Sequence, residues 1–141
     1  MKVNEHGLRV EIEAEAWECI HQWAQLAKGE FSCLGVVDDD LYISQVHLLE
    51  QESTDVGTEM DPEAIAKLLV RHPEPGKVRA WIHSHGDMKC FWSHTDEDCI
   101  EGLANDGFLV SLVVNHAGET RCRVDIFQPV RITIDHVPVV V

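Results

Sequence analysis

Two histidines that could bind a metal ion, His83 and His85, lie two positions apart in the segment VRAWIHSH. The alternation in this segment predicts a β-strand. Because side chains on a strand alternate between its two faces, both imidazoles point the same way and can converge on one ion. Catalytic zinc sites typically use three protein ligands and keep one position for water. The pair therefore predicts a metal site that needs a third donor.

The third donor is expected just beyond the loop that follows this strand, where the next helix begins. Two histidines and a carboxylate form a familiar zinc set, and the helix dipole favours an aspartate near a helix start. Spacing alone leaves four residues open: Asp87, His94, Asp96 and Asp98. Cys90 and Cys99 are possible soft ligands, but nothing in their spacing supports a closed structural zinc site.

The composition excludes several classes of function. The 141 residues include 25 Asp and Glu against 11 Lys and Arg, a formal charge of -14, which repels nucleic acid and anionic lipid surfaces. No apolar run approaches the ~20 residues that cross a bilayer, and the first residues lack the pattern of an export signal. Five cysteines without a C-x-x-C pair are typical of reduced thiols. We expect a cytoplasmic protein.

The elements that must position the histidines can be read from the apolar spacing. A helix is predicted over residues 14–28, then a hairpin formed by FSCLGVV and LYISQVHLL. The polar stretch QESTDVGTEM predicts an exposed loop, and Asp61-Pro62 predicts the start of a second helix.

After the histidine-bearing strand, Thr95-x-x-Asp98 is typical of a capping box that starts a third helix. Three β-rich runs complete the chain: FLVSLVVN, ETRCRVDIF and VRITIDHVPVVV. Mixed strands and helices in a chain of this length predict a single α/β domain, with a mixed central β-sheet and helices packed on its faces.

The run His83-Ser84-His85, seven residues, Ser93, two residues, Asp96 resembles the JAMM motif of the MPN zinc metalloproteases, His-x-His-x7-Ser-x2-Asp. Glu30, in GEFSCLGVV, stands where that family carries a glutamate before an apolar strand. The predicted elements also come in the family's order. The resemblance implies that residues 1–141 form one compact, prokaryotic-type JAMM/MPN domain with the MPN (cytidine-deaminase-like) fold.

The same resemblance implies roles for five residues. His83, His85 and Asp96 would be the zinc ligands, Glu30 the general acid and base, and Ser93 a hydrogen-bond donor to the oxyanion. Zinc lowers the pKa of a coordinated water to about 7, so that water can act as the nucleophile at neutral pH. The expected function is a zinc metallopeptidase of the deubiquitinase-like type. It would hydrolyse the amide bond after the C-terminal tail of a ubiquitin-like or sulfur-carrier protein.

The chain departs from the family pattern near the expected site. Cys33 stands where many members have glycine, so we expect its side chain to narrow the space beside the metal. Gly86-Asp87 replaces the usual proline after the second histidine and predicts a looser loop in GDMKCFW. The segments that grip ubiquitin in eukaryotic relatives are short here, which leaves QESTDVGTEM and residues 88–92 as the expected substrate walls.

Three alternatives remain. The same site would suit a peptidase or amidase that acts on small peptides, and relatives that lost their ligands serve as catalytically silent MPN scaffolds. A zinc nucleoside deaminase is disfavoured because the chain lacks the H-x-E and P-C-x-x-C patterns. The C-terminal run VPVVV is a plausible edge strand for a homodimer.

Overall fold

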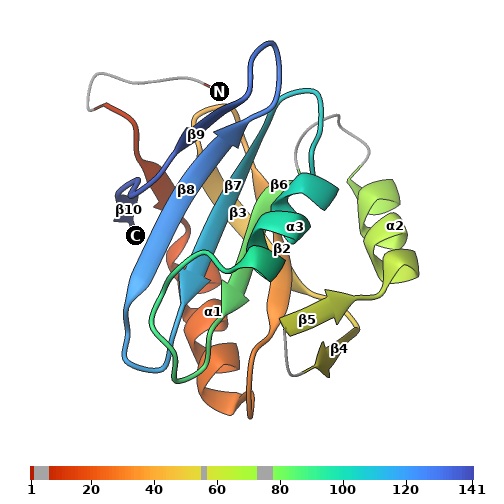
Figure 1. Cartoon of the computed structure of the whole chain (residues 1–141), viewed down its shortest axis with the longest axis vertical. Coiled ribbons are helices and arrows are strands. Elements are labelled where there is room, and N and C mark those ends of the chain that lie inside the picture. Colours follow the sequence, from red (N-terminus) through yellow and green to blue (C-terminus); the bar gives the residue numbers. More distant parts are fainter. Residues whose placement is uncertain (2–6, 55–56, 73–77) are drawn as a thin grey trace.

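The computed structural model describes residues 1, 7–54, 57–72 and 78–141, which form a curled, mixed sheet with three helices (Figure 1). The sheet order is β10-β1-β3-β2-β6-β7-β8-β9, and β4 and β5 form a separate two-stranded sheet. The helices are α1 (Ala14–Leu26), α2 (Pro62–Arg71) and α3 (His94–Gly102). The strands are β1 (Val10–Ile12), β2 (Ser32–Val37), β3 (Tyr42–Leu48), β4 (Gln51–Thr54), β5 (Gly57–Met60), β6 (Val78–Ser84), β7 (Phe108–Val114), β8 (Thr120–Ile126), β9 (Ile132–Ile134) and β10 (Val139–Val140).

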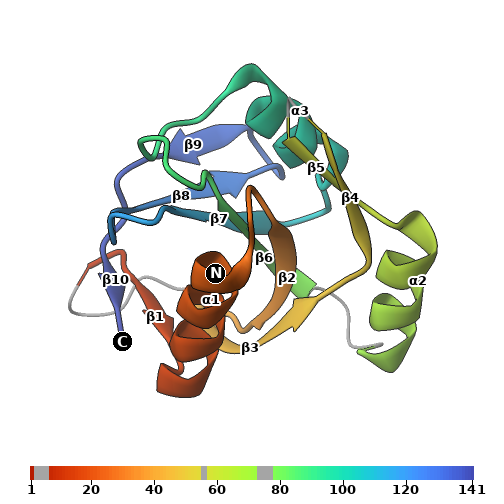
Figure 2. The same cartoon turned by 90° about the horizontal axis from the view of Figure 1, so that it is seen from below.

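The helices lie on both faces of the main sheet, with α1 on one and α2 and α3 on the other, as Figure 2 shows from below. The sheet curls around α1, whose Ile20 and Ala24 pack with Ile82 of β6 in the larger apolar cluster. The smaller cluster lies on the opposite face, where Trp81 packs with α2 and α3 through Leu68 and Ile100. Strand alternation along β6 therefore directs Ile82 toward α1 and its neighbour Trp81 toward α2 and α3.

Most of the predicted elements are present. The helix at residue 14 ends at Leu26, close to the predicted end, and β2 and β3 form the expected antiparallel hairpin. Asp61 caps α2 as predicted, because its side chain accepts a hydrogen bond from the Glu63 amide at 3.2 Å. The general α/β architecture with a mixed sheet is thus observed. No helix in the described part of the chain combines the length and apolar character needed to cross a membrane.

The prediction that QESTDVGTEM is a loop is wrong. Its described residues form β4 and β5, which pair antiparallel from Gln51 opposite Met60. The side chain of Gln51 also holds this small sheet against β2. Its Oε1 accepts a hydrogen bond from the backbone N–H of Ser32 at 2.7 Å, and its Nε2 donates one to the Ser32 carbonyl at 2.8 Å. β4 and β5 are polar, and they are stabilised by pairing with each other and by the Gln51 side chain. Their sequence therefore lacks the apolar alternation from which a strand is predicted.

Two other boundaries also differ from the prediction. The third helix begins two residues early, because Ser93 and Asp96 form the capping box in place of Thr95 and Asp98. The last β-rich run is split into β9 and β10, which lie at opposite edges of the main sheet. β10 pairs with β1, a three-residue strand that was too short to be predicted.

The packing between β2 and β6 predicts the effect of a single added methyl group. A Cβ at Gly35 would lie 3.0 Å from the Ala80 Cβ and 3.3 Å from the Gln45 carbonyl oxygen, neither of which can move away easily. We expect Gly35→Ala to lower the free energy of unfolding by about 1–3 kcal/mol in urea titrations. The matched control is Gly102→Ala, where a Cβ meets nothing within 4 Å. It should be neutral or stabilise the protein by up to about 1 kcal/mol, and a comparable loss in both variants would contradict the packing argument.

Candidate metal centre

The two histidines lie at the carboxyl end of β6, in the middle of the main sheet. Both side chains are buried, and their Nε2 atoms are 3.1 Å apart. β6 pairs in parallel with β7 up to Ser84 and Val114, and the His85 amide continues this pairing by donating to the Val114 carbonyl at 2.9 Å. The strand therefore places both imidazoles on the α3 side of the sheet, as its alternation predicts.

Asp96 supplies the third donor from the first turn of α3. Its Oδ1 lies 3.2 Å from the His83 Nε2 and its Oδ2 lies 3.1 Å from the His85 Nε2. The other three candidates are excluded by position. His94 and Asp98 are exposed and face each other, while Asp87 is exposed and binds a different histidine. The structure thus brings His83, His85 and Asp96 together as a buried group that could hold a metal ion.

The spacing of the donor atoms fits a small tetrahedral cation. An ion with ligand distances of about 2.0–2.1 Å separates its ligand atoms by roughly 3.3 Å. The Nε2 atoms of His83 and His85 are 3.1 Å apart, and each lies 3.1–3.2 Å from a different oxygen of the Asp96 carboxylate. The two imidazole nitrogens are therefore spaced nearly as they would be around one ion, and one ligand atom from each of the three residues lies within 4.8 Å of the others.

Hydrogen bonding provides an independent test of the fit. His85 Nδ1 lies 2.9 Å from the Lys89 carbonyl oxygen, and a carbonyl can only accept, so this nitrogen carries the proton. In the neutral ring, Nε2 is then an acceptor, yet it faces an Asp96 oxygen that also only accepts. The arrangement is attractive only when a proton or a cation lies between these atoms. A second partner that fixes the tautomer in this way is typical of histidine ligands of metals.

The electrostatics favour the metal-binding states of His83 and Asp96 but oppose that of His85. Burial lowers the pKa of His83 despite the neighbouring Asp96 carboxylate. Burial opposes ionisation of Asp96, but hydrogen bonds from the two imidazoles outweigh it and hold the pKa well below its usual range. For His85, burial is outweighed by hydrogen bonds to Asp96 and to the Lys89 carbonyl, which raise its pKa. A proton on His85 is therefore the competitor that a metal ion must displace.

Glu30, the predicted acid and base, precedes β2 and lies beside the metal ligands. It lines a cavity of about 20 Å³ together with His83 and Asp96. A space of at least roughly 10–15 Å³ is needed for one water molecule, so this cavity accommodates about one. Sequence and structure therefore bring Glu30 and the metal ligands to the same small space.

Ser93, the predicted oxyanion donor, caps α3. Its Oγ accepts a hydrogen bond from the Asp96 amide at 3.0 Å, and its own amide donates to Asp96 Oδ2 at 2.9 Å. A hydroxyl that accepts in this way keeps its own hydrogen for a further bond. The capping box thus fixes the Asp96 carboxylate and leaves Ser93 with a donor at the edge of the metal centre.

Aromatic rings cover the two imidazoles, and the sequence reasoning did not single them out. Trp81 stacks on His83 with ring centroids 4.1 Å apart and planes 9° apart, while Phe91 meets His85 edge-on at 4.8 Å. Trp92 is tilted against His83 at 6.0 Å. The signal for Trp81 was its position two residues before His83 on the same face of the strand.

The expectation drawn from Cys33 is wrong, and the structure also locates Cys99, which the sequence left as a possible soft ligand. Cys33 does not narrow the site, because its side chain lies in the apolar cluster on the α1 side of the sheet. Cys99 does line the small cavity, but burial raises the pKa of its thiol to about 12, so it stays protonated and is a poor ligand.

The segment after His85, predicted to be loose, is held by hydrogen bonds to neighbouring elements. The Met88 carbonyl accepts from the Asn115 side chain at 3.0 Å. His116 contacts Asp87 Oδ1 through Nδ1 at 2.8 Å and the Ala24 carbonyl at the end of α1 through Nε2 at 2.8 Å. These hydrogen bonds connect the segment to the turn after β7 and to the end of α1.

Metal binding should stabilise the fold in a way that depends on Asp96. We expect Zn²⁺ to bind at about one ion per chain and, at 100 times its dissociation constant, to add about 2.7 kcal/mol to the free energy of unfolding. Asp96→Asn should weaken binding by at least about tenfold, whereas the exposed Asp98→Asn should leave it unchanged. Calorimetric titration and unfolding with and without a chelator measure both effects. An equal loss of Zn²⁺ affinity in the two variants would show that the ion binds at a site other than the one formed with Asp96.

The His116 contacts predict a dependence of stability on pH in metal-free protein. The hydrogen bond to Asp87 raises the pKa of His116 above its ordinary value of 6.5. The ion pair between protonated His116 and Asp87 therefore contributes fully to the free energy of unfolding below about pH 6.5. This contribution is lost as the pH rises through the raised pKa of His116. Asp87→Asn should lower the free energy of unfolding near pH 6 and leave it nearly unchanged near pH 9. Urea titrations across this range test the change in slope, and Asp40→Asn, in a distant turn, should keep the wild-type slope.

Comparisons with known proteins address the fold alone. No protein-family model and no curated protein matches the chain. The solution structure of protein DSY2949 from Desulfitobacterium hafniense is similar, with a TM-score of 0.62 and 18% sequence identity over 93% of this chain and 91% of that one. The chain therefore shares its overall α/β fold with this bacterial protein.

Proposed function

We propose that this chain is a zinc-dependent hydrolase of amide or isopeptide bonds with the JAMM/MPN fold. The observation that carries the proposal is the water-sized cavity shared by Glu30, His83 and Asp96. A carboxylate beside a buried His-His-Asp group is the minimum needed for metal-assisted hydrolysis. The motif His-x-His-x7-Ser-x2-Asp, which fills every specified position, adds the support of family resemblance.

Zinc is the proposed metal because two neutral imidazoles and one carboxylate are its familiar ligands in catalytic sites. When bound by His83, His85 and Asp96, it would supply a Lewis acid that polarises a carbonyl and lowers the pKa of water. Asp96 is ionised, as a metal ligand must be, and the Lys89 carbonyl leaves Nε2 of His85 to face the ion once its proton is displaced.

Glu30 is the proposed proton carrier. Its carboxylate accepts a proton from the water that attacks the carbonyl carbon, and returns that proton to the nitrogen when the carbon–nitrogen bond breaks. The Glu30 carboxylate is close enough to act on both imidazoles through its charge. It acts to raise the pKa of His83 and of His85, whereas burial, the larger effect, acts to lower both. Among the residues that the structure describes, Glu30 and Asp96 are the acidic side chains that line the small cavity.

Ser93 is the proposed oxyanion donor. Its hydroxyl sits at the N-terminus of α3, where the capping bond to the Asp96 amide fixes its position. A fixed hydroxyl aimed at developing negative charge stabilises a tetrahedral transition state without reorganisation.

The proposed substrate is the extended C-terminal tail of a ubiquitin-like or sulfur-carrier protein. β5 borders the small cavity through Thr58, whose Oγ1 lies 2.5 Å from the Ser32 Oγ. A two-stranded sheet presents edge backbone groups to which an extended peptide can add as a strand. The charge of -14 favours partners with a basic face.

The test is cleavage of a panel of ubiquitin-like fusion proteins by metal-loaded enzyme. Glu30→Gln should lose at least about 100-fold in rate while binding Zn²⁺ as tightly as wild type. The matched control is Glu18→Gln on the exposed side of α1, which should retain full activity. Turnover of short peptides without any fusion cleavage would favour a small-substrate amidase. Bound zinc without any cleavage would favour a scaffold and contradict the proposal.

A further inference from the structure

We propose that Arg123 is a positioning residue for the metal ligand Asp96: it fastens the first turn of α3 to β8 and so sets where the Asp96 carboxylate lies. The inference rests on the metal centre of the proposed function, and assigns part of its geometry to a residue outside the motif.

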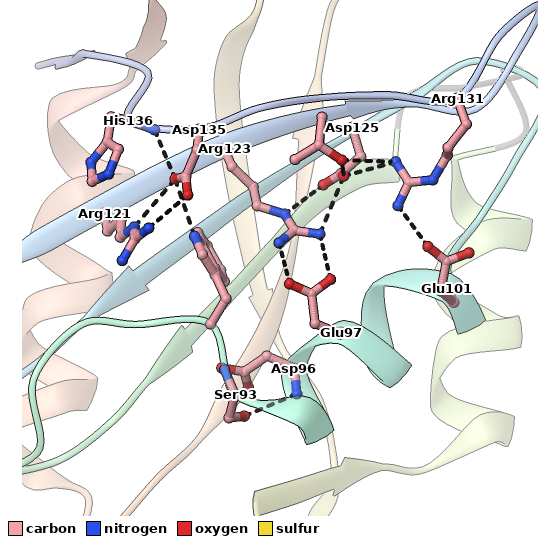
Figure 3. Close-up of polar contacts among 12 residues, drawn as sticks. Ser93, Asp96, Glu97, Glu101, Arg121, Arg123, Asp125, Arg131, Asp135 and His136 are labelled. Carbon is pink, nitrogen blue, oxygen red and sulfur yellow. Dashed lines mark hydrogen bonds and ion pairs between the residues drawn. The ribbon is translucent and has the colours of Figure 1, made fainter.

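The guanidinium of Arg123 joins the helix to the sheet through two bidentate pairs (Figure 3). Nη1 and Nη2 donate to the two Glu97 carboxylate oxygens of α3 at 2.5 and 2.8 Å. Nε and Nη2 donate to Asp125 Oδ2 and Oδ1 on the same strand at 2.8 and 3.2 Å. Arg123 and Asp125 are buried, whereas Glu97 is partly exposed. A planar guanidinium held on both edges permits only one orientation of its partners.

Both sides of the capping box depend on Arg123. Glu97 directly follows Asp96, and its amide donates to the Ser93 carbonyl at 3.0 Å. Trp92 directly precedes Ser93, and its ring lies under the Arg123 guanidinium at 5.1 Å. The residues before and after the Ser93–Asp96 box are therefore both held by one side chain.

Trp92 is in turn fixed from the other end of its ring. Its Nε1 donates to Asp135 Oδ1 at 3.2 Å, and Asp135 is bound by Arg121 at 2.6 Å. Arg121, Arg123 and Asp125 alternate along β8, so all three side chains point toward α3. β8 thus presents these three charged side chains to α3, the helix that carries Asp96.

Apolar packing alone anchors α3 weakly. The helix has nine residues, and its buried side chains are Ile100 and Asp96 itself. Helices this short are marginal without tertiary contacts. A buried ion pair is on average no more stabilising than apolar residues of equal volume, because desolvation offsets the attraction. What the Arg123–Glu97 pair adds is a fixed orientation of the helix, and this is the property that a metal ligand in its first turn requires.

Arg131 provides a matched control within the same network. It binds Glu101, one turn further along α3, at 2.6 Å, and also contacts Asp125 at 2.8 Å. Its side chain is more exposed than that of Arg123, and it lies away from the capping box. Removing it breaks the same kind of contact on the same helix without touching Trp92 or Glu97.

The experiment measures Zn²⁺ affinity by competition with a chelator for wild type, Arg123→Met, Glu97→Ala and Arg131→Met. We expect affinity to fall by about 10- to 100-fold in the first two variants and by less than about twofold in Arg131→Met. Because Arg123→Met leaves Asp125 with one cation fewer in a buried site, Glu97→Ala serves as the variant that keeps the Arg123–Asp125 pair intact. The absorption spectrum of Co²⁺-loaded protein should change shape in the affected variants, which a uniform loss of stability does not produce.

Wild-type zinc affinity in folded Arg123→Met and Glu97→Ala would overturn the proposal, as would an equal loss in Arg131→Met. Amide hydrogen exchange of the metal-free proteins separates this inference from the metal centre itself. Faster exchange confined to the Ser93–Glu97 segment in Arg123→Met supports the positioning role even if wild-type protein binds no zinc, an outcome that would instead contradict the proposed function.

Discussion

The centre of this molecule is an electrostatic conflict between acceptor atoms. The Lys89 carbonyl commits one nitrogen of His85 as a donor, so the other nitrogen meets Asp96 as an acceptor at 3.1 Å. Acceptors buried at this distance repel each other unless a positive charge lies between them. The group is therefore held together by whichever positive charge lies between these atoms, a proton on His85 or a cation, and the surrounding elements keep the three side chains close enough to share it.

Each ligand is restrained by a different kind of contact. The central strand β6 positions the imidazoles, and aromatic rings pack against them, so packing in the core restrains their orientation. The carboxylate comes from a short helix with little apolar contact, and its rigidity comes from hydrogen bonds and ion pairs. This division follows from position, because the end of a buried strand is surrounded by packed side chains, whereas the start of a surface helix is not.

The sequence predicts those features that depend on local periodicity or on spacing within one segment. The alternation in VRAWIHSH places His83 and His85 on one face, and the proline after Asp61 marks the start of α2; both features are observed. Spacing could not choose among the candidates for the third ligand, because that choice depends on where α3 begins. The predicted capping box at Thr95 and Asp98 puts this start two residues too late, because Ser93 and Asp96 form the box.

Features that depend on pairing between distant segments could not be predicted. β4 and β5 are polar, so their strand character comes from each other and not from a buried face. The last run of β-branched residues divides between the two edges of the main sheet, which no local pattern indicates. The alternating Arg121, Arg123 and Asp125 do carry a periodic signal, but charged residues inside a strand are ordinarily read as a solvated face, and here they are covered by α3.

The attachment of the β4–β5 sheet has a consequence for how this fold can diversify. Gln51 satisfies both the N–H and the C=O of Ser32 with one side-chain amide, so a primary carboxamide takes the place of a further β3 residue beside β2, just beyond the Cys33–Leu48 pair. The ladder between β4 and β5 is separate from that of the main sheet. Replacements at described positions of this small sheet, such as Thr58, can therefore reshape what borders the cavity while the register of β2 against β6 stays unchanged.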